Sequence, residues 1–132
     1  GGDFVPAEIR VGEPTVRVKL RLKGDYTDHL EGEKWSMRVH VKRKNQLFGM
    51  RRFSLQAPRT RGFQAEPIVL DHYRREGVLA PRYSFAEVSV NGDDLGLMAV
   101  EESFGQELLE SQQRREGVII CGNDSMNWQA IL

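Results

Sequence analysis

The amino-acid sequence predicts an α+β domain, in which an antiparallel sheet of about five strands carries two helices. Segments in which apolar and charged side chains alternate strictly indicate strands with one buried face. Segments that end in Arg-Arg-Glu-Gly indicate helices, since basic residues followed by glycine are typical of helix ends. Strands and helices that follow one another in runs, without a regular βα alternation, favour the α+β class.

The length and composition fit one folded domain. The chain has 132 residues, of which 39% are hydrophobic, and this is enough for a core. Its apolar runs are too short for a membrane-spanning helix, and the single cysteine, Cys121, excludes an internal disulfide framework. We expect a lead-in segment at 1–14, the domain at 15–121 and an irregular tail at 122–132. The chain begins without methionine, which indicates a processed or excised piece.

Two alternating segments predict the first pair of strands. Residues 15–23 and 34–43 are separated by a polar, glycine-bracketed loop at 24–33. The apolar positions are Val16, Val18, Leu20, Leu22, Trp35, Met37, Val39 and Val41. The intervening outward positions are Arg17, Lys19, Arg21, Lys23, Arg38, His40 and Lys42. If the two strands pair, the sheet has one apolar face and one basic face.

The next elements are a third strand and a helix. A turn at Lys44-Asn45-Gln46 leads into a strand at 47–57, with a bulge near Arg51 and Arg52 because Met50 falls out of phase. A basic connector at 58–62 follows. The helix begins at Pro67, since proline suits the first helical position, and ends at Gly77.

A hairpin, a second helix and a short strand complete the prediction. Asn91-Gly92-Asp93-Asp94 joins strands at 83–90 and 95–102. Ser103 caps the second helix, with Gln106 at the capping-box position, and this helix ends at Gly117. A short strand follows at 118–121. The repeated Arg-Arg-Glu-Gly-Val at 74–78 and 114–118 is interpreted as two similar helix ends.

The net charge of zero conceals a segregation of charge. The chain has 19 Lys and Arg against 19 Asp and Glu. Residues 34–62 contain nine basic residues and no acid, whereas residues 84–113 contain seven acids and no base. One surface of the domain is therefore expected to be cationic and another anionic.

Three interpretations of the basic sheet face remain open. The basic side chains can simply be exposed to solvent, or they can bind phosphate or another polyanion. They can also be neutralised by the acidic segment 84–113 or by a further domain. A nucleic-acid partner is disfavoured, because no aromatic side chains are interleaved with the bases and Trp35 lies in the inward phase.

No pattern in the chain indicates a catalytic nucleophile or a metal site. His29, His40 and His72 lack metal-ligand spacing, and Cys121 has no neighbouring histidine. Glu101 and Glu102 end the last long strand, where alternation places one of them on each face. One of these two carboxylates is therefore expected in an unusual environment.

Four segments in fixed order make the chain recognisable. They are Leu22-Lys23-Gly24 with Glu33-Lys34-Trp35-Ser36-Met37-Arg38-Val39, then Phe48-Gly49-Met50-Arg51-Arg52-Phe53-Ser54-Leu55, then Arg75-Glu76-Gly77-Val78-Leu79-Ala80-Pro81-Arg82-Tyr83, and Val88-Ser89-Val90-Asn91-Gly92-Asp93-Asp94-Leu95-Gly96-Leu97-Met98 closing at Glu102. Over roughly residues 15–120 this order resembles the spore-coat protein H (CotH) kinase-like family. The Asn-Gly hairpin followed by glycine and glutamate is the most specific part.

The resemblance implies a fold like the ATP-binding small lobe of a kinase. ATP with Mg would then be the cofactor, and the basic face would meet its phosphates. The residues implied in nucleotide binding are Lys23, Gly24, Asp25 and Thr27 in a phosphate-covering loop, Arg52 at a phosphate, Glu66 as a helix partner and Glu102 at the hinge.

The chain departs from the family pattern in ways that limit the expected activity. Arginine stands on the third strand where a kinase uses lysine, Met98 replaces a usual tyrosine, and Pro58-Arg59-Thr60-Arg61-Gly62 stands where the family commonly has Asp-Ser-Thr-like residues. No segment supplies a catalytic base or two metal-binding acids, so we expect no phosphate transfer by this chain alone. The expected partners are a downstream large lobe and a protein substrate. The alternative is a non-enzymatic module whose basic face meets an acidic partner.

Overall fold

The computed structural model describes residues 2–22, 36–42, 45–62 and 64–120. The elements in chain order are β1 (Val5–Arg10), β2 (Thr15–Leu22), β3 (Met37–Val41), β4 (Arg52–Gln56), the 3₁₀ helix η2 (Pro58–Arg61), α1 (Ala65–Arg75), β5 (Tyr83–Val90), β6 (Asp93–Glu102) and α2 (Gln106–Ser111). The predicted α+β class is confirmed.

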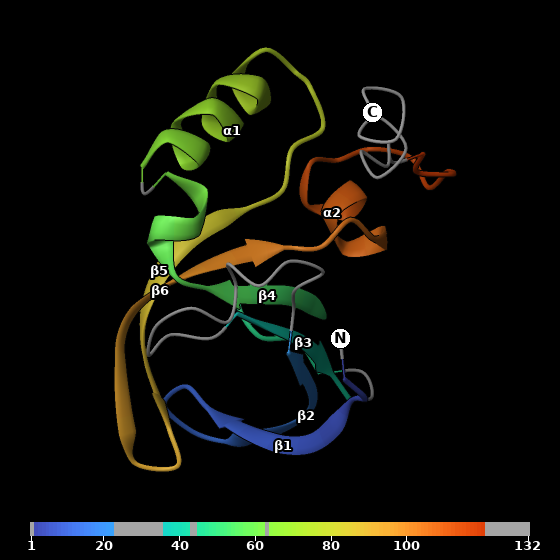
Figure 1. The fold of residues 1–132 in the computed structure, drawn as a ribbon. Coiled ribbons are helices and arrows are strands. Elements are labelled where there is room, and N and C mark those ends of the chain that lie inside the picture. The colour runs from blue at the N-terminus through green and yellow to red at the C-terminus, as the bar shows by residue number, and fades with distance from the viewer. Residues whose placement is uncertain (1, 23–35, 43–44, 63, 121–132) are drawn as a thin grey trace, which may run out of the picture.

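The strands form one antiparallel sheet in the order β1-β2-β3-β4-β6-β5. Figure 1 shows the sheet curling into a half-barrel, with the β5–β6 hairpin and β1 bending toward the same side. Both helices lie on the opposite, outer side of the sheet (Figure 1). The curl therefore separates an enclosed inner face from an outer face that the helices cover only in part.

The inner face holds the main hydrophobic core. Its buried side chains come from the inward positions of β2, β3, β4 and β6 and from the turn before β4: Val18, Met37, Val39, Val41, Leu47, Met50, Phe53, Leu55, Met98 and Val100. Partly buried side chains of β1 and of the β5–β6 hairpin pack against this cluster. The two-residue period of the strands thus produces the predicted one-sided burial.

The outer face is buried only where β4 meets β6. Gln56 and Ala99 are paired across these strands and are fully buried, although they point away from the core cluster. Leu108 and Leu109 are the buried residues of α2, whereas α1 has none. Among the described residues, no helix lies on the outer face of β2 and β3 (Figure 1).

The first strand corrects one prediction. Residues 1–14, expected as a lead-in segment, contain β1, so the sheet has six strands. Pro6 concealed this strand in the sequence, because proline is unfavourable inside a sheet. It is tolerated here because β1 is an edge strand, where one side of the backbone needs no hydrogen-bond partner.

The approach to β4 also differs from the prediction. The strand begins at Arg52, and residues 47–50 form a tight turn in which Leu47 and Met50 exchange both backbone hydrogen bonds. Phe48 and Gly49 have left-handed backbones, with φ of 55° and 73°. This turn, and not a bulge, is what puts Met50 out of phase. A left-handed phenylalanine leaves no recognisable signal in the sequence.

The helix boundaries are shifted from those expected. The first helix begins at Ala65, two residues before Pro67. The cap of α2 is Gly105 and not Ser103, and no side chain caps this helix. It ends at Ser111, well before Gly117, because Gln113 turns left-handed at φ 53°.

The expected short strand at 118–121 is absent from its described part. Residues 118–120 are extended coil, and Val118 and Ile120 are each 91% exposed. No strand of the described residues packs against these side chains, so a short apolar run alone was a poor guide here.

The predicted β5–β6 hairpin is confirmed, although β6 begins at Asp93 and not at residue 95. Asn91 and Gly92 form its two-residue turn with φ of 53° and 90°, which are the left-handed values that favour Asn-Gly. The pairing shifts at Val88 and Ser89, opposite Gly96 and Asp94. The Gly96 N–H donates to the Asp94 carboxylate at 2.7 Å.

Several predictions fall outside the described residues. They are the polar loop at 24–33, the inward orientation of Trp35, and the irregular tail at 122–132. Within the part of the chain that the structure describes, neither helix has the length and apolar character needed to cross a membrane.

Candidate functional site

The outer face of β2, β3 and β4 is a cationic strip. Its members are Arg17, Lys19, Arg21, Arg38, His40, Lys42 and Arg52. The strand register aligns Lys19, His40 and Arg52 in one row and places Arg21 opposite Arg38. The predicted pairing of the two basic strand faces is thus confirmed, and the third strand adds Arg52 to them.

A cleft of about 400 Å³ lies where the cationic strip meets the segment before α2. This cationic cleft is lined by Arg38, His40, Arg52, Ser54, Glu101, Glu102, Ser103 and Phe104. Its floor comes from β3, β4 and Glu101 of β6, and the chain that leaves β6 forms its wall. Segments distant in sequence therefore converge on one polar site.

The floor of the cleft runs from positive to negative charge. Arg38 pairs with Ser54, and Ser54 pairs with Glu101, so a hydroxyl separates the guanidinium from the carboxylate. Gln56 holds the Glu101 carboxylate through its Nε2, at 2.7 Å from Oε2. The cationic end of the floor is therefore the end suited to an anion.

Arg52 is positioned by the glycine that precedes α2. A Cβ atom at Gly105 would lie 3.1 Å from Nη2 of Arg52 and 3.2 Å from a carboxylate oxygen of Glu107. The guanidinium of Arg52 thus packs directly on the helix cap. The sequence suggested Ser103 for this cap and gave no sign that Gly105 makes room for Arg52.

His40 lies in the centre of the cationic strip and resists protonation. Its pKa lies below the usual 6.5, first because the ring is partly buried and then because of the neighbouring positive charges. In decreasing order these charges are Arg52, Arg38, Arg21 and Lys19. Burial and the positive charge of the strip therefore both favour the neutral imidazole.

Phe4 partly covers the strip from the N-terminal side. Its ring lies 4.3 Å from the His40 ring, centroid to centroid, and the Arg21 guanidinium carbon lies 4.8 Å from the Phe4 centroid. These contacts are an aromatic pair and a cation–π interaction. The sequence offered no means of placing Phe4, because this residue precedes the first strand and belongs to no periodic pattern.

The structure places three of the seven residues named from the family resemblance. Arg52 and Glu102 line the cationic cleft. Glu66 lies in the first turn of α1, and no described residue of α1 lines this cleft. The other four, Lys23, Gly24, Asp25 and Thr27, lie outside the described residues.

The carboxylate of Glu102 is held by Arg82. Nε of Arg82 donates to Oε2 at 2.9 Å, and Nη2 donates to Oε1 at 2.6 Å. The Arg82 backbone N–H donates to Oε2 at 3.1 Å. Glu102 is 3% exposed, so the expectation that one of the paired glutamates is unusually placed is met. Its hydrogen bonds raise the pKa of Arg82, against the opposing effect of burial.

Arg82 also ties the turn before β4 to the end of β6. Its Nη2 donates to the carbonyl oxygen of Gly49 at 2.9 Å. A Cβ atom at Gly49 would approach Nη1 of Arg82 to 2.9 Å, so glycine is required both for the left-handed backbone and for this close approach. The ion pair of Glu102 therefore organises one wall of the cleft.

The lining residues suit phosphate better than a metal ion. Arg38, Arg52, His40 and Ser54 supply N–H and O–H donors, which phosphate oxygens accept. Mg²⁺ needs carboxylates or phosphates, and in this cleft Glu102 is held by Arg82 while Glu101 accepts from Gln56. No group of three or more His, Cys, Asp or Glu among the described residues could hold a metal.

The family of the chain follows from comparison with known proteins. The family described as CotH kinase protein matches residues 20–130. The chain belongs to the CotH kinase protein family. The match begins in β2 and includes every residue that lines the cationic cleft. Comparison with curated proteins gives no match.

Membership of the CotH kinase protein family implies ATP and Mg in general terms. The cationic end of the cleft fits the phosphates of such a nucleotide. The described residues do not offer a complete ligand set for the metal ion.

We predict that Glu102→Gln destabilises the fold by about 1.5–3 kcal/mol, because it removes charged hydrogen bonds from Arg82 and turns an amide toward a guanidinium. Urea unfolding followed by circular dichroism measures this loss. The control is Glu8→Gln, whose ion pair with Arg17 is exposed and 3.8 Å long, and which should cost well under 1 kcal/mol. Equal losses in the two variants would contradict the role of Glu102.

We predict that the free energy of unfolding falls as the pH is lowered through 6.5. The pKa of His40 is lower in the folded than in the unfolded chain, so in this window the unfolded state binds more protons. His40→Gln should remove this component of the pH dependence, and His72→Gln, which changes a helix residue outside the strip, should keep it. The same pH slope in wild type and His40→Gln would argue against the depressed pKa.

Proposed function

We propose that the cationic cleft binds the phosphates of ATP, and that the chain is the nucleotide-binding small lobe of a CotH-like kinase. The observation that carries this proposal is the convergence of Arg38, His40 and Arg52 on one cleft floor beside Ser54. Phosphoryl transfer depends mostly on positioning and on neutralising phosphate charge, and these side chains are suited to both tasks.

The cleft also suggests the direction in which the nucleotide lies. Its cationic end is formed by Arg38 and Arg52, whereas Phe104 lies beyond the end of β6 and is 46% exposed. We place the phosphates over the arginines and the base against Phe104, since an exposed aromatic ring can stack on a purine. In this placement the residues after Glu102 form the hinge.

The segment that follows β2 is the proposed cover of the phosphates. Leu22, the last residue of β2, pairs with Met37, which directly precedes Arg38 of the cleft floor. Lys23, Gly24, Asp25 and Thr27 follow Leu22 in the sequence. The proposed role of Glu66 as a helix partner rests on the family resemblance alone.

In this function the residues of the chain bind and orient the nucleotide. Arg38 and Arg52 offset the charge of the phosphates, and Ser54 donates to a phosphate oxygen. Mg would further neutralise the phosphates, and a large lobe would supply the acids that hold it and the base that activates a protein substrate.

We predict that the full-length protein binds ATP and that Arg52→Gln weakens this binding about tenfold or more, because a charge-assisted hydrogen bond to phosphate is lost. Titration calorimetry measures the affinity. Arg17→Gln is the matched control, since Arg17 lies on the same strip but outside the cationic cleft. Unchanged affinity in Arg52→Gln, or no binding of ATP by the wild type, would overturn the proposal.

We also predict that ATP raises the pKa of His40, because phosphate charge offsets the cations that lower it. NMR titration of the His40 ring with and without ATP measures this shift. By linkage, ATP binds more tightly as the pH falls through the range in which His40 titrates. A pKa of His40 that ATP leaves unchanged would place the phosphates elsewhere.

A second candidate function is a non-enzymatic surface that meets an acidic partner. It is favoured by Arg17, Lys19 and Lys42, which extend the cationic strip beyond the cleft. The two functions differ in which residues they need. A partner bound along the whole strip loses affinity in Lys42→Gln and in Arg17→Gln, whereas ATP binding in the cleft is insensitive to both.

A further inference from the structure

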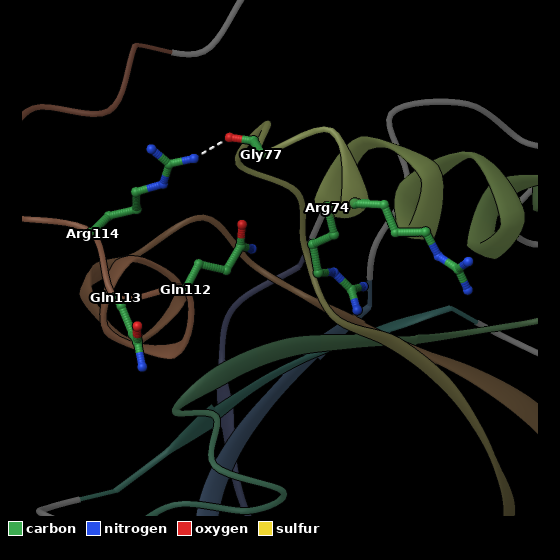
Figure 2. Close-up of a pocket in the computed structure, with 6 residues that line it drawn as sticks. Arg74, Gly77, Gln112, Gln113 and Arg114 are labelled. Atoms are coloured by element: carbon green, nitrogen blue, oxygen red, sulfur yellow. Dashed lines mark hydrogen bonds between the residues drawn. The ribbon is translucent and has the colours of Figure 1, made fainter.

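A second polar cleft lies at the carboxyl ends of both helices. It has a volume of about 530 Å³ and is lined by Arg74, Arg75, Gly77, Gln112, Gln113 and Arg114. In Figure 2, Gln112, Gln113 and Arg114 lie on the α2 side of the cleft, and Arg74 and Gly77 lie on the α1 side. Arg114 reaches across toward Gly77. It shares no lining residue with the cationic cleft.

The lining of this arginine cleft is positively charged. Three of its six residues are arginines and none is acidic. Arg75 pairs with Asp71 at 2.8 Å along the exposed face of α1, which offsets one of the three charges. Arg74 and Arg114 make no ion pair within the part of the chain that the structure describes. An excess of positive charge therefore remains at the cleft.

Backbone carbonyl groups hold the cleft side chains in place but leave donors unused. Arg114 donates from Nη2 to the carbonyl oxygen of Gly77, and Arg74 donates from Nη2 to that of Pro81 at 2.9 Å. Gln112 donates to the carbonyl oxygen of Ala80 at 2.5 Å. Since a guanidinium has five N–H donors, both arginines keep donors for a further acceptor.

One of these donors is buried and has no acceptor. Nε of Arg74 is inaccessible to solvent and has no hydrogen-bond partner among the described residues. A buried donor without a partner is costly, by about 1–3 kcal/mol. An oxyanion that enters the cleft and attracts the Arg74 guanidinium would offer it an acceptor.

The duplicated Arg-Arg-Glu-Gly segments meet at this cleft. The first supplies Arg74, Arg75 and Gly77, and the second supplies Arg114, whose guanidinium is bonded to Gly77. The sequence predicts both segments as helix ends, where arginines stabilise the terminal carbonyl groups, but α2 ends at Ser111 and only the first segment lies at a helix end. That explanation does not require arginines from both segments to line one cavity.

We propose that the arginine cleft binds the phosphate group of a phosphorylated peptide. Three arginines line the cavity, and a phosphate suits them better than a carboxylate, which carries less charge and fewer acceptor oxygens. Gln112 and Gln113 offer amide groups, which can both donate to and accept from a peptide backbone. The cleft is therefore a docking site for a phosphopeptide, separate from the ATP site.

The test is titration of the full-length protein with a short phosphoserine peptide, its unphosphorylated form, and inorganic phosphate. Arg114→Gln and Arg75→Gln should each weaken the phosphopeptide about tenfold. Arg115→Gln is the matched control, since it removes the same charge from the adjacent residue, which does not line the cleft. The Arg75 side chain is largely exposed, so Arg75→Gln should remain folded. This variant still tests the proposal if Arg114→Gln fails to fold.

The outcomes separate the sources of phosphate and the two proposed sites. Preference for the phosphopeptide over inorganic phosphate supports peptide docking, whereas equal affinity would replace it with a site for free phosphate. Absence of binding, or equal losses in Arg115→Gln and Arg114→Gln, would overturn the proposal and leave the arginines as helix caps. Arg52→Gln should leave phosphopeptide binding intact, so failure here is distinguishable from failure of ATP binding.

Discussion

The strand register between β2 and β3 is the constraint on which the molecule depends. It pairs Leu20 with Val39 inside the curl and Lys19 with His40 outside it. A slip of one residue would send the charged set into the core, so the core also determines where the cations lie. Like charges opposite each other destabilise a sheet by about 0.2–1 kcal/mol per pair, a cost that core burial offsets.

The outer face is divided between packing and binding. Toward β6 it is sealed around Gln56 and Ala99, and toward β2 it is open and basic. The cationic cleft lies at the boundary, where Arg52 rests on the cap of α2. The ion pair of Arg82 with Glu102 holds the end of β6 in place at this boundary. The residues that line the cleft are therefore fixed by the end of the sheet.

Sequence periodicity could predict the structural features that depend on residues close together in the chain. It identified the paired basic faces, the Asn-Gly hairpin and the class of the fold, since each of these depends on local spacing. It missed β1, in which Pro6 hides a permitted edge strand, and the left-handed turn at Phe48. Arg52 could be assigned to a site only through the family resemblance. The contact between Arg82 and Glu102 could not be predicted, because folding brings together two residues that are far apart in the sequence.

The position of Phe4 makes the start of the chain a part of the cationic strip. The ring covers His40 and is itself covered by Arg21, so an anion that reaches this row from solvent must displace the ring or lie beside it. A displaced ring would expose apolar surface, whereas a retained ring would shield the bound charge from water. The conformation of the segment before β1 therefore decides how much of this row an anion can reach.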